Sequence, residues 1–190
     1  MPSNVRIYFH ARQTLGSSAR EVFDLFSLDR PADVLSFELR FVRSAVATLT
    51  LFARTLTLDR PSGRFCGLDF EDVWLDKDAV LAPDGTIFFV DLEGLEEVRV
   101  EEAAVREKLE DQVYRSLYEF MFGFEQIEQE RARRFGERPD RRAHFERVLA
   151  EAVKEDPFVR LAPAGGGLDL IVRNALEREN LYLAFRIVDR

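Results

Sequence analysis

The sequence predicts an α+β protein: a mainly helical unit that contains one β-hairpin, followed by a small antiparallel β-meander. Apolar residues recur at helical spacing in two long stretches, 31–55 and 102–135. Two short apolar runs flank a turn of Pro, Asp and Gly at 83–85, the pattern of a hairpin. We expect residues 1–156 to form the helical domain and residues 157–190 to be a meander appended to it.

The first predicted elements are a strand and a short helix. Apolar and polar residues alternate over residues 4–11, which indicates a half-buried strand. Ser18 and Glu21 have the spacing of a capping box, and the apolar residues behind them extend a helix to Leu28.

The first long helix is predicted over residues 31–55, with Pro31 at its start. Its apolar residues lie on nearly all sides, so the helix belongs inside the protein. Glu38, Arg40 and Arg43 make it too polar to span a membrane.

The second long helix is predicted over residues 102–135, and Gly136 terminates it. Gly123 interrupts the apolar pattern, which predicts a kink or a close packing contact. Asp140 then caps a further helix that runs to about Glu155.

The remaining chain is predicted to form strands at 158–162, 168–173 and 181–188, the pattern of a small meander. The arginines around the junction of the two preceding helices are expected to form a solvated face, because glutamates dilute their charge. His144 is expected to pack inside or to lie at the rim of its helix.

Composition limits the classes of function. With 46% hydrophobic and 33% charged residues, the chain is globular, and its net charge of −8 argues against a nucleic-acid partner. No apolar run approaches the length of a membrane span, and the amino terminus lacks a signal-peptide pattern. The single Cys66 fits a reducing cytoplasm. A protein partner or a second copy of the chain is the partner class that remains open.

Acidic residues surround the predicted hairpin. Asp78 and Asp91 stand at its two outer ends, so closing the hairpin would bring the two carboxylates together. Such a pair raises the pKa of its members or shares a cation. With Glu93 they offer hard oxygen ligands, which suit magnesium, manganese or calcium, and magnesium is the possible cofactor. The alternative is an ordinary hairpin with solvated acids.

The segment from Asp78 to Gly94 resembles the catalytic-to-magnesium stretch of protein kinases. Asp78 stands where the family has its catalytic-loop Asn, and Asp91 stands where it has the Asp of Asp-Phe-Gly, at the usual spacing. One residue is inserted before Gly94. The resemblance extends over about residues 4–125. It implies a kinase C-terminal lobe with the two long helices at its centre and Asp78 and Asp91 holding magnesium.

The departures from the kinase pattern concern catalysis. Val73 stands at the position of the catalytic base, so Asp69 or Asp72 could serve only in a remodelled loop. No lysine precedes this loop, and the chain lacks a glycine-rich phosphate loop. The resemblance therefore implies a pseudokinase-like binding or regulatory module that lacks the N-terminal lobe. A magnesium-dependent phosphotransferase completed by a partner chain is the alternative.

A third interpretation concerns the Asp91-x-Glu93 sequence at the end of an apolar run. It is similar to the Asp-x-Glu motif of two-metal exonucleases, in which paired carboxylates hold both ions. That family also needs a later His or Tyr followed by an Asp at helical spacing. His144 is followed by Val148 and Leu149 instead, so this interpretation is the least favoured.

Overall fold

The computed structural model describes residues 19–69, 79–89, 92–136, 140–164, 167–172 and 183–186. The strand predicted at 4–11 lies outside these ranges, and so do Asp72, Asp78 and Asp91.

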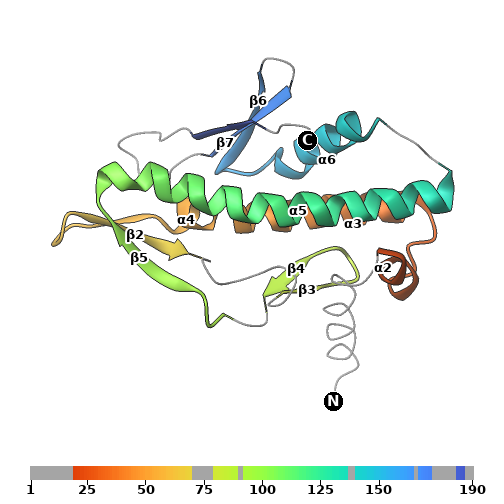
Figure 1. Cartoon of the computed structure of the whole chain (residues 1–190), viewed down its shortest axis with the longest axis horizontal. Coiled ribbons are helices and arrows are strands. Elements are labelled where there is room, and N and C mark those ends of the chain that lie inside the picture. Colours follow the sequence, from red (N-terminus) through yellow and green to blue (C-terminus); the bar gives the residue numbers. More distant parts are fainter. Residues whose placement is uncertain are drawn as a thin grey trace.

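Two helices, α3 (Pro31–Leu49) and α5 (Val105–Phe135), form the centre of the molecule (Figure 1). They pack against each other and run in opposite directions. The shorter α6 (Arg141–Val153) packs on α3, and α2 (Ala19–Leu25) packs against α5. The prediction that the two long helices pack together is confirmed.

The first long helix is shorter than predicted. It breaks at Thr50, after which α4 (Leu51–Thr55) begins. The buried Thr50 hydroxyl donates to the carbonyl oxygen of Val46 at 2.7 Å, a bond that competes with regular helix geometry. Arg54 in turn donates to the Thr50 hydroxyl at 2.6 Å. The break therefore coincides with a buried side chain that hydrogen-bonds to its own helix.

A three-stranded antiparallel sheet was not predicted. It consists of β1 (Thr57–Asp59), β2 (Arg64–Asp69) and β5 (Glu96–Val100), with β2 in the centre. Its outer strands have only three and five residues, so any apolar alternation in them is too short to indicate a strand. Helix α4 lies against β2 so closely that a Cβ atom at Gly67 would fall 2.5 Å from the ring of Phe52.

The predicted hairpin is confirmed as β3 (Ala79–Leu81) and β4 (Ile87–Phe89), an isolated antiparallel pair. Gly85 has φ +92, which favours glycine, and a methyl group there would overlap the backbone of Phe37. The turn of the hairpin is therefore fixed directly on α3.

The later elements also follow the prediction. A short 3₁₀ turn (Glu102–Ala104) leads into α5, which ends at Gly136 in the left-handed conformation with φ +68. The Asp140 side chain accepts from the backbone N–H groups of Arg142 and Ala143 and so caps α6.

The C-terminal strands form an antiparallel sheet in the order β6 (Val159–Ala164), β7 (Gly167–Val172) and β8 (Leu183–Arg186). It contacts α6 through β6 and α5 through β8. The predicted meander is thus present in the described strands.

Aromatic side chains fill the space between the helices. Gly123 of α5 allows the close approach of α3, because a Cβ atom there would lie 3.1 Å from Phe41 Cζ. The close contact predicted at this glycine is confirmed. Within the described ranges, no helix combines the length and the apolar character needed to cross a membrane. The largest fully buried aromatic side chains are Phe23, Phe37, Phe41 and Phe52.

Candidate functional site

The described part of the chain includes two of the acids predicted to be functional, Asp69 and Glu93. Asp69 is the last residue of β2 and is buried, and its carboxylate forms an ion pair with Lys108 of α5. Glu93 is exposed in the turn that follows the hairpin. The two acids therefore lie in different environments, and the predicted magnesium ligands Asp78 and Asp91 are outside the described residues.

A second group of ionisable side chains is enclosed between α3, α5 and α6. It consists of Glu38, Glu128, Arg131 and His144, which we call the buried cluster. At most 9% of any of these side chains is exposed. The cluster corrects one prediction, because Arg131 was expected on a solvated face and is buried instead.

The three helices bring these residues together for local reasons. Glu128 and Arg131 are three residues apart on α5, so their side chains share one face of the helix. His144 is in the first turn of α6, where its backbone N–H donates to the Asp140 carbonyl at 2.8 Å. Glu38 projects from α3, and its side chain is completely buried.

One nitrogen of Arg131 lies among the other three groups. Its Nη1 is 3.4 Å from Glu38 Oε2, 3.4 Å from Glu128 Oε1 and 2.8 Å from His144 Nε2. The same ring nitrogen of His144 is 2.9 Å from Glu38 Oε2 and 3.3 Å from Glu128 Oε1. The guanidinium therefore supplies positive charge to both carboxylates.

The imidazole of His144 meets a guanidinium at each of its ring nitrogens. Arg147 Nη2 is 2.8 Å from Nδ1, and Arg131 Nη1 is 2.8 Å from Nε2. Nε2 also lies 2.9 Å from the acceptor Glu38 Oε2. Arg131 therefore contacts the ring as well as the two carboxylates. The ring also stacks on Phe124, with 6.2 Å between centroids.

The environment changes the acidity of Glu128. Burial raises the pKa of its carboxyl to about 7, and a hydrogen bond with Glu38 and the charge of that residue act in the same direction. His144 and Arg131 lower the pKa of Glu128, but by less. Two carboxyl groups that share a site in this way tend to hold one proton between them.

The cluster also has the composition of a metal site. Glu38, Glu128 and His144 each offer a ligand atom, and these atoms lie within 4.8 Å of one another. Carboxylate and imidazole ligands suit several divalent ions. However, Arg131 Nη1 is already placed among the three atoms, so an ion could bind only if this guanidinium moved away. The geometry therefore favours an internally neutralised cluster over a metal centre.

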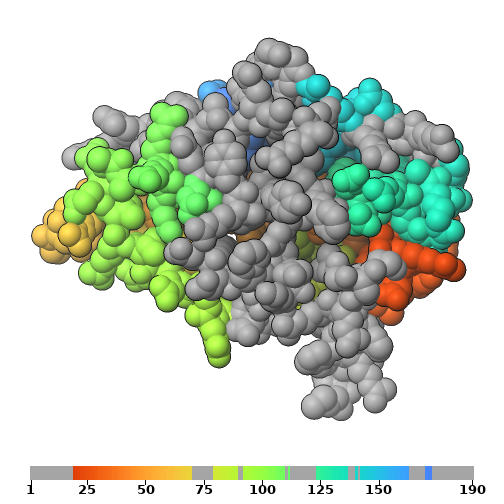
Figure 2. Space-filling view, viewed as in Figure 1, coloured from red at the N-terminus to blue at the C-terminus, as the bar shows by residue number. Residues whose placement is uncertain are grey.

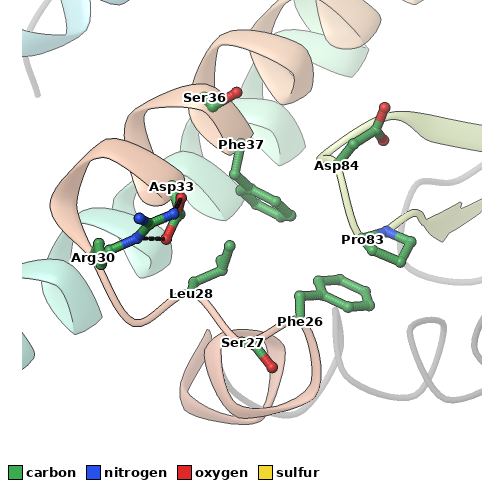
Figure 3. A pocket seen from close by; sticks show the side chains of 9 residues that line it. All are labelled: Phe26, Ser27, Leu28, Arg30, Asp33, Ser36, Phe37, Pro83 and Asp84. Atoms are coloured by element: carbon green, nitrogen blue, oxygen red, sulfur yellow. Dashed lines mark hydrogen bonds and ion pairs between the residues drawn. The ribbon is translucent and has the colours of Figure 1, made fainter.

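A separate, open pocket of about 380 Å³ lies between the α2–α3 connection and the turn of the hairpin. Figure 3 shows the side chains of Phe26, Leu28, Phe37 and Pro83 directed toward its interior. At its edge Arg30 donates to both carboxylate oxygens of Asp33, at 2.7 and 2.8 Å. Ser27, Ser36 and Asp84 also line the pocket, so its surface combines apolar side chains with hydroxyl and charged groups.

One residue of the buried cluster, Glu38, is conspicuous in the sequence, although the sequence alone did not predict the cluster. Glu38 is an acid within a helix that is apolar on nearly all sides, and a buried acid requires a partner. That partner could not be named, because Arg131 and His144 are 93 and 106 residues away along the chain.

No family model, curated protein or solved structure matches this chain. Its function is therefore inferred from the chemistry of its own residues.

Proposed function

We propose that this chain is a non-catalytic binding or regulatory module, related in arrangement to the C-terminal lobe of a protein kinase. It does not transfer phosphate by itself. The observation that carries this proposal is the position of Asp69, the one predicted catalytic acid among the described residues.

A general base must come within hydrogen-bond reach of the substrate hydroxyl. The Asp69 side chain is only 5% exposed, and its negative charge is balanced by Lys108. It also belongs to a paired strand, opposite Glu96 of β5, rather than to a loop that could be remodelled. These features support a structural role for Asp69, in which it connects the sheet to α5.

The helical arrangement supports the kinase-like part of the proposal. The two long helices pack at the centre, and an isolated two-stranded hairpin lies on α3 between them in sequence. The open pocket beside the turn of this hairpin, lined by both aromatic and polar side chains, offers a surface on which a partner could bind (Figure 3).

The test is a phosphotransfer assay on the purified chain with ATP and magnesium. We expect no turnover above the background rate, for the wild type and for Asp69→Asn alike. Turnover that Asp91→Ala abolishes would overturn the proposal. Turnover that appears only when a second chain is co-purified would favour the alternative, a phosphotransferase completed by a partner. The matched control is Glu107→Gln, an exposed acid in the first turn of α5.

A further inference from the structure

We propose that the buried cluster is a proton-binding site, in which Glu38, Glu128 and His144 share one proton, and that its occupancy controls how firmly α6 is held on α3 and α5. This inference does not depend on the proposed function. It concerns residues of the helical core that neither the kinase resemblance nor the hairpin acids involve.

The first argument is enclosure. The side chains of Glu38, Glu128 and His144 are 0%, 4% and 1% exposed, so water does not solvate their charges from outside. A charge held in such a place is unfavourable unless an opposite charge compensates it.

The second argument is the balance of charge. The groups that face one another are Glu38 from α3, Glu128 and Arg131 from α5, and His144 and Arg147 from α6. With an uncharged imidazole, the two carboxylates and the Arg131 guanidinium carry a net charge of −1. Arg147 is exposed and touches the far ring nitrogen, so water screens much of its charge. A single proton, held by a carboxyl group or by the imidazole, makes these four groups neutral.

The third argument is the proximity of the two carboxyl groups. Both approach the same ring nitrogen of His144, at 2.9 and 3.3 Å, and both approach the same guanidinium nitrogen. The raised pKa of Glu128, to about 7, supports the same conclusion, and its contact with Glu38 is among the causes. The proton is therefore bound in the range around neutrality.

Helix α6 is the element that responds to this proton. It is the shortest of the three helices around the cluster, and it reaches the carboxylates through His144. It is also attached to α3 by the hydrogen bond from Arg43 to the Ala152 carbonyl, at 3.3 Å. Loss of the proton leaves two like charges beside the ring and favours entry of water. The resulting opening separates α6 from the α3–α5 pair, which remains packed by its aromatic residues.

The magnitude follows from proton linkage. If the closed cluster binds its proton with a pKa of about 7 and the opened one with the ordinary value of 4.5, the opening equilibrium rises about tenfold between pH 6 and pH 8. We expect this tenfold rise in hydrogen exchange only at backbone amides that exchange through the opening of α6.

Amide hydrogen exchange tests the proposal, with rates corrected for the intrinsic effect of pH. We expect the protection of α6 to fall about tenfold from pH 6 to pH 8 in the wild type, while the middle of α3 changes less. Glu128→Gln, which keeps the shape of a protonated carboxyl, is expected to remove the pH dependence. Glu38→Gln provides a second test if that variant does not fold. Glu130→Gln is the matched control, because Glu130 lies on α5 but pairs with Arg133 and Arg134 outside the cluster.

Two results would overturn the proposal. One is α6 protection that does not depend on pH in the wild type, or that keeps its dependence in both cluster variants. The other is protection at pH 8 that zinc restores in the wild type and not in His144→Gln, which would identify the cluster as a metal site instead.

Discussion

Replacing Glu128 by Gln should stabilise the protein at alkaline pH and leave it nearly unchanged at acidic pH. The Glu128 carboxyl has a pKa of about 7 in the folded protein, against an ordinary value of 4.5. Between these values the folded state binds more protons than the unfolded state. The free energy of unfolding therefore falls as the pH rises from about 4.5 to about 7, and this contribution is lost above pH 7.

The magnitude follows from the shift. A rise of about 2.5 pKa units corresponds to about 3 kcal/mol, at roughly 1.4 kcal/mol per unit. Relaxation of the cluster and entry of water reduce this, so we expect Glu128→Gln to be about 1–3 kcal/mol more stable than the wild type at pH 8. The amide is neutral, can donate to Glu38 and can accept from Arg131, as the protonated acid does.

The assay is urea unfolding followed by far-ultraviolet circular dichroism, from pH 5 to pH 8.5, at constant ionic strength. A constant slope against denaturant shows that the variant changes stability and not the unfolded state. The reasoning is refuted if the wild type becomes more stable as the pH rises through this range. It is also refuted if Glu128→Gln is less stable than the wild type at pH 8, because Glu128 would then act as the ionised partner of Arg131.

Three further predictions concern other parts of the molecule. The pKa of Glu130 is lowered to about 2, chiefly by its hydrogen bond with Arg133, so its contribution to the free energy of unfolding is lost as the pH falls from 4.5 toward 2. Glu130→Gln should therefore lower the free energy of unfolding by about 1 kcal/mol at pH 7 and by less at pH 3, which urea melts at the two pH values would show. Gly85→Ala should lower the free energy of unfolding by more than about 2 kcal/mol, because the new methyl group would meet the backbone of Phe37 at a residue with positive φ. Gly63 also has positive φ but faces open space, so Gly63→Ala should cost only about 1 kcal/mol. Equal losses of stability in thermal melts of the two variants would contradict the contact at Gly85. If the hairpin acids hold magnesium, the ion should raise the melting temperature of the wild type more than that of Asp78→Asn, and equal shifts would remove the magnesium hypothesis.

Ion pairs at one end of α5 explain why Glu130 and not Glu128 is a stabilising anion. Glu130 accepts from Arg133 at 2.5 and 2.6 Å and from Arg134 at 2.7 Å. Arg134 also pairs with Asp24, which connects α5 to α2 where their surfaces adjoin in Figure 2. Positive charge therefore surrounds Glu130, whereas Glu128 faces a second carboxylate.

The sequence was sufficient where local patterns decide the structure. The apolar spacing of α5, the Asp140 cap and the turn at Gly85 each depend on residues close together in the chain, and each was predicted correctly. The break at Thr50 was missed because the apolar pattern continues through it from α3 into α4. The β1–β2–β5 sheet was missed because β5 pairs with β2 from a distant part of the chain.

The buried cluster could not be predicted for a related reason. Glu38, the member of the cluster on α3, could be recognised in the sequence as an acid in an apolar helix. The groups that contact it come from α5 and α6. In the sequence, Arg131 belongs to a group of arginines that together predict a solvated face. The packing of the three helices buries Arg131, whereas Arg133 remains more than half exposed. Burial of a charge is decided by the tertiary structure, and the local composition does not reveal it.

The central claim, that the buried cluster binds a proton near neutral pH, is tested most directly by the titration of the Glu128 carboxyl. Its ¹³C resonance can be followed by NMR from pH 4 to pH 9 and assigned by its disappearance in Glu128→Gln. The account predicts a midpoint near pH 7 for this carboxyl, because the cluster holds one proton in that range. A midpoint at or below the ordinary value of 4.5 would show that Glu128 is ionised in the folded protein and would contradict the account.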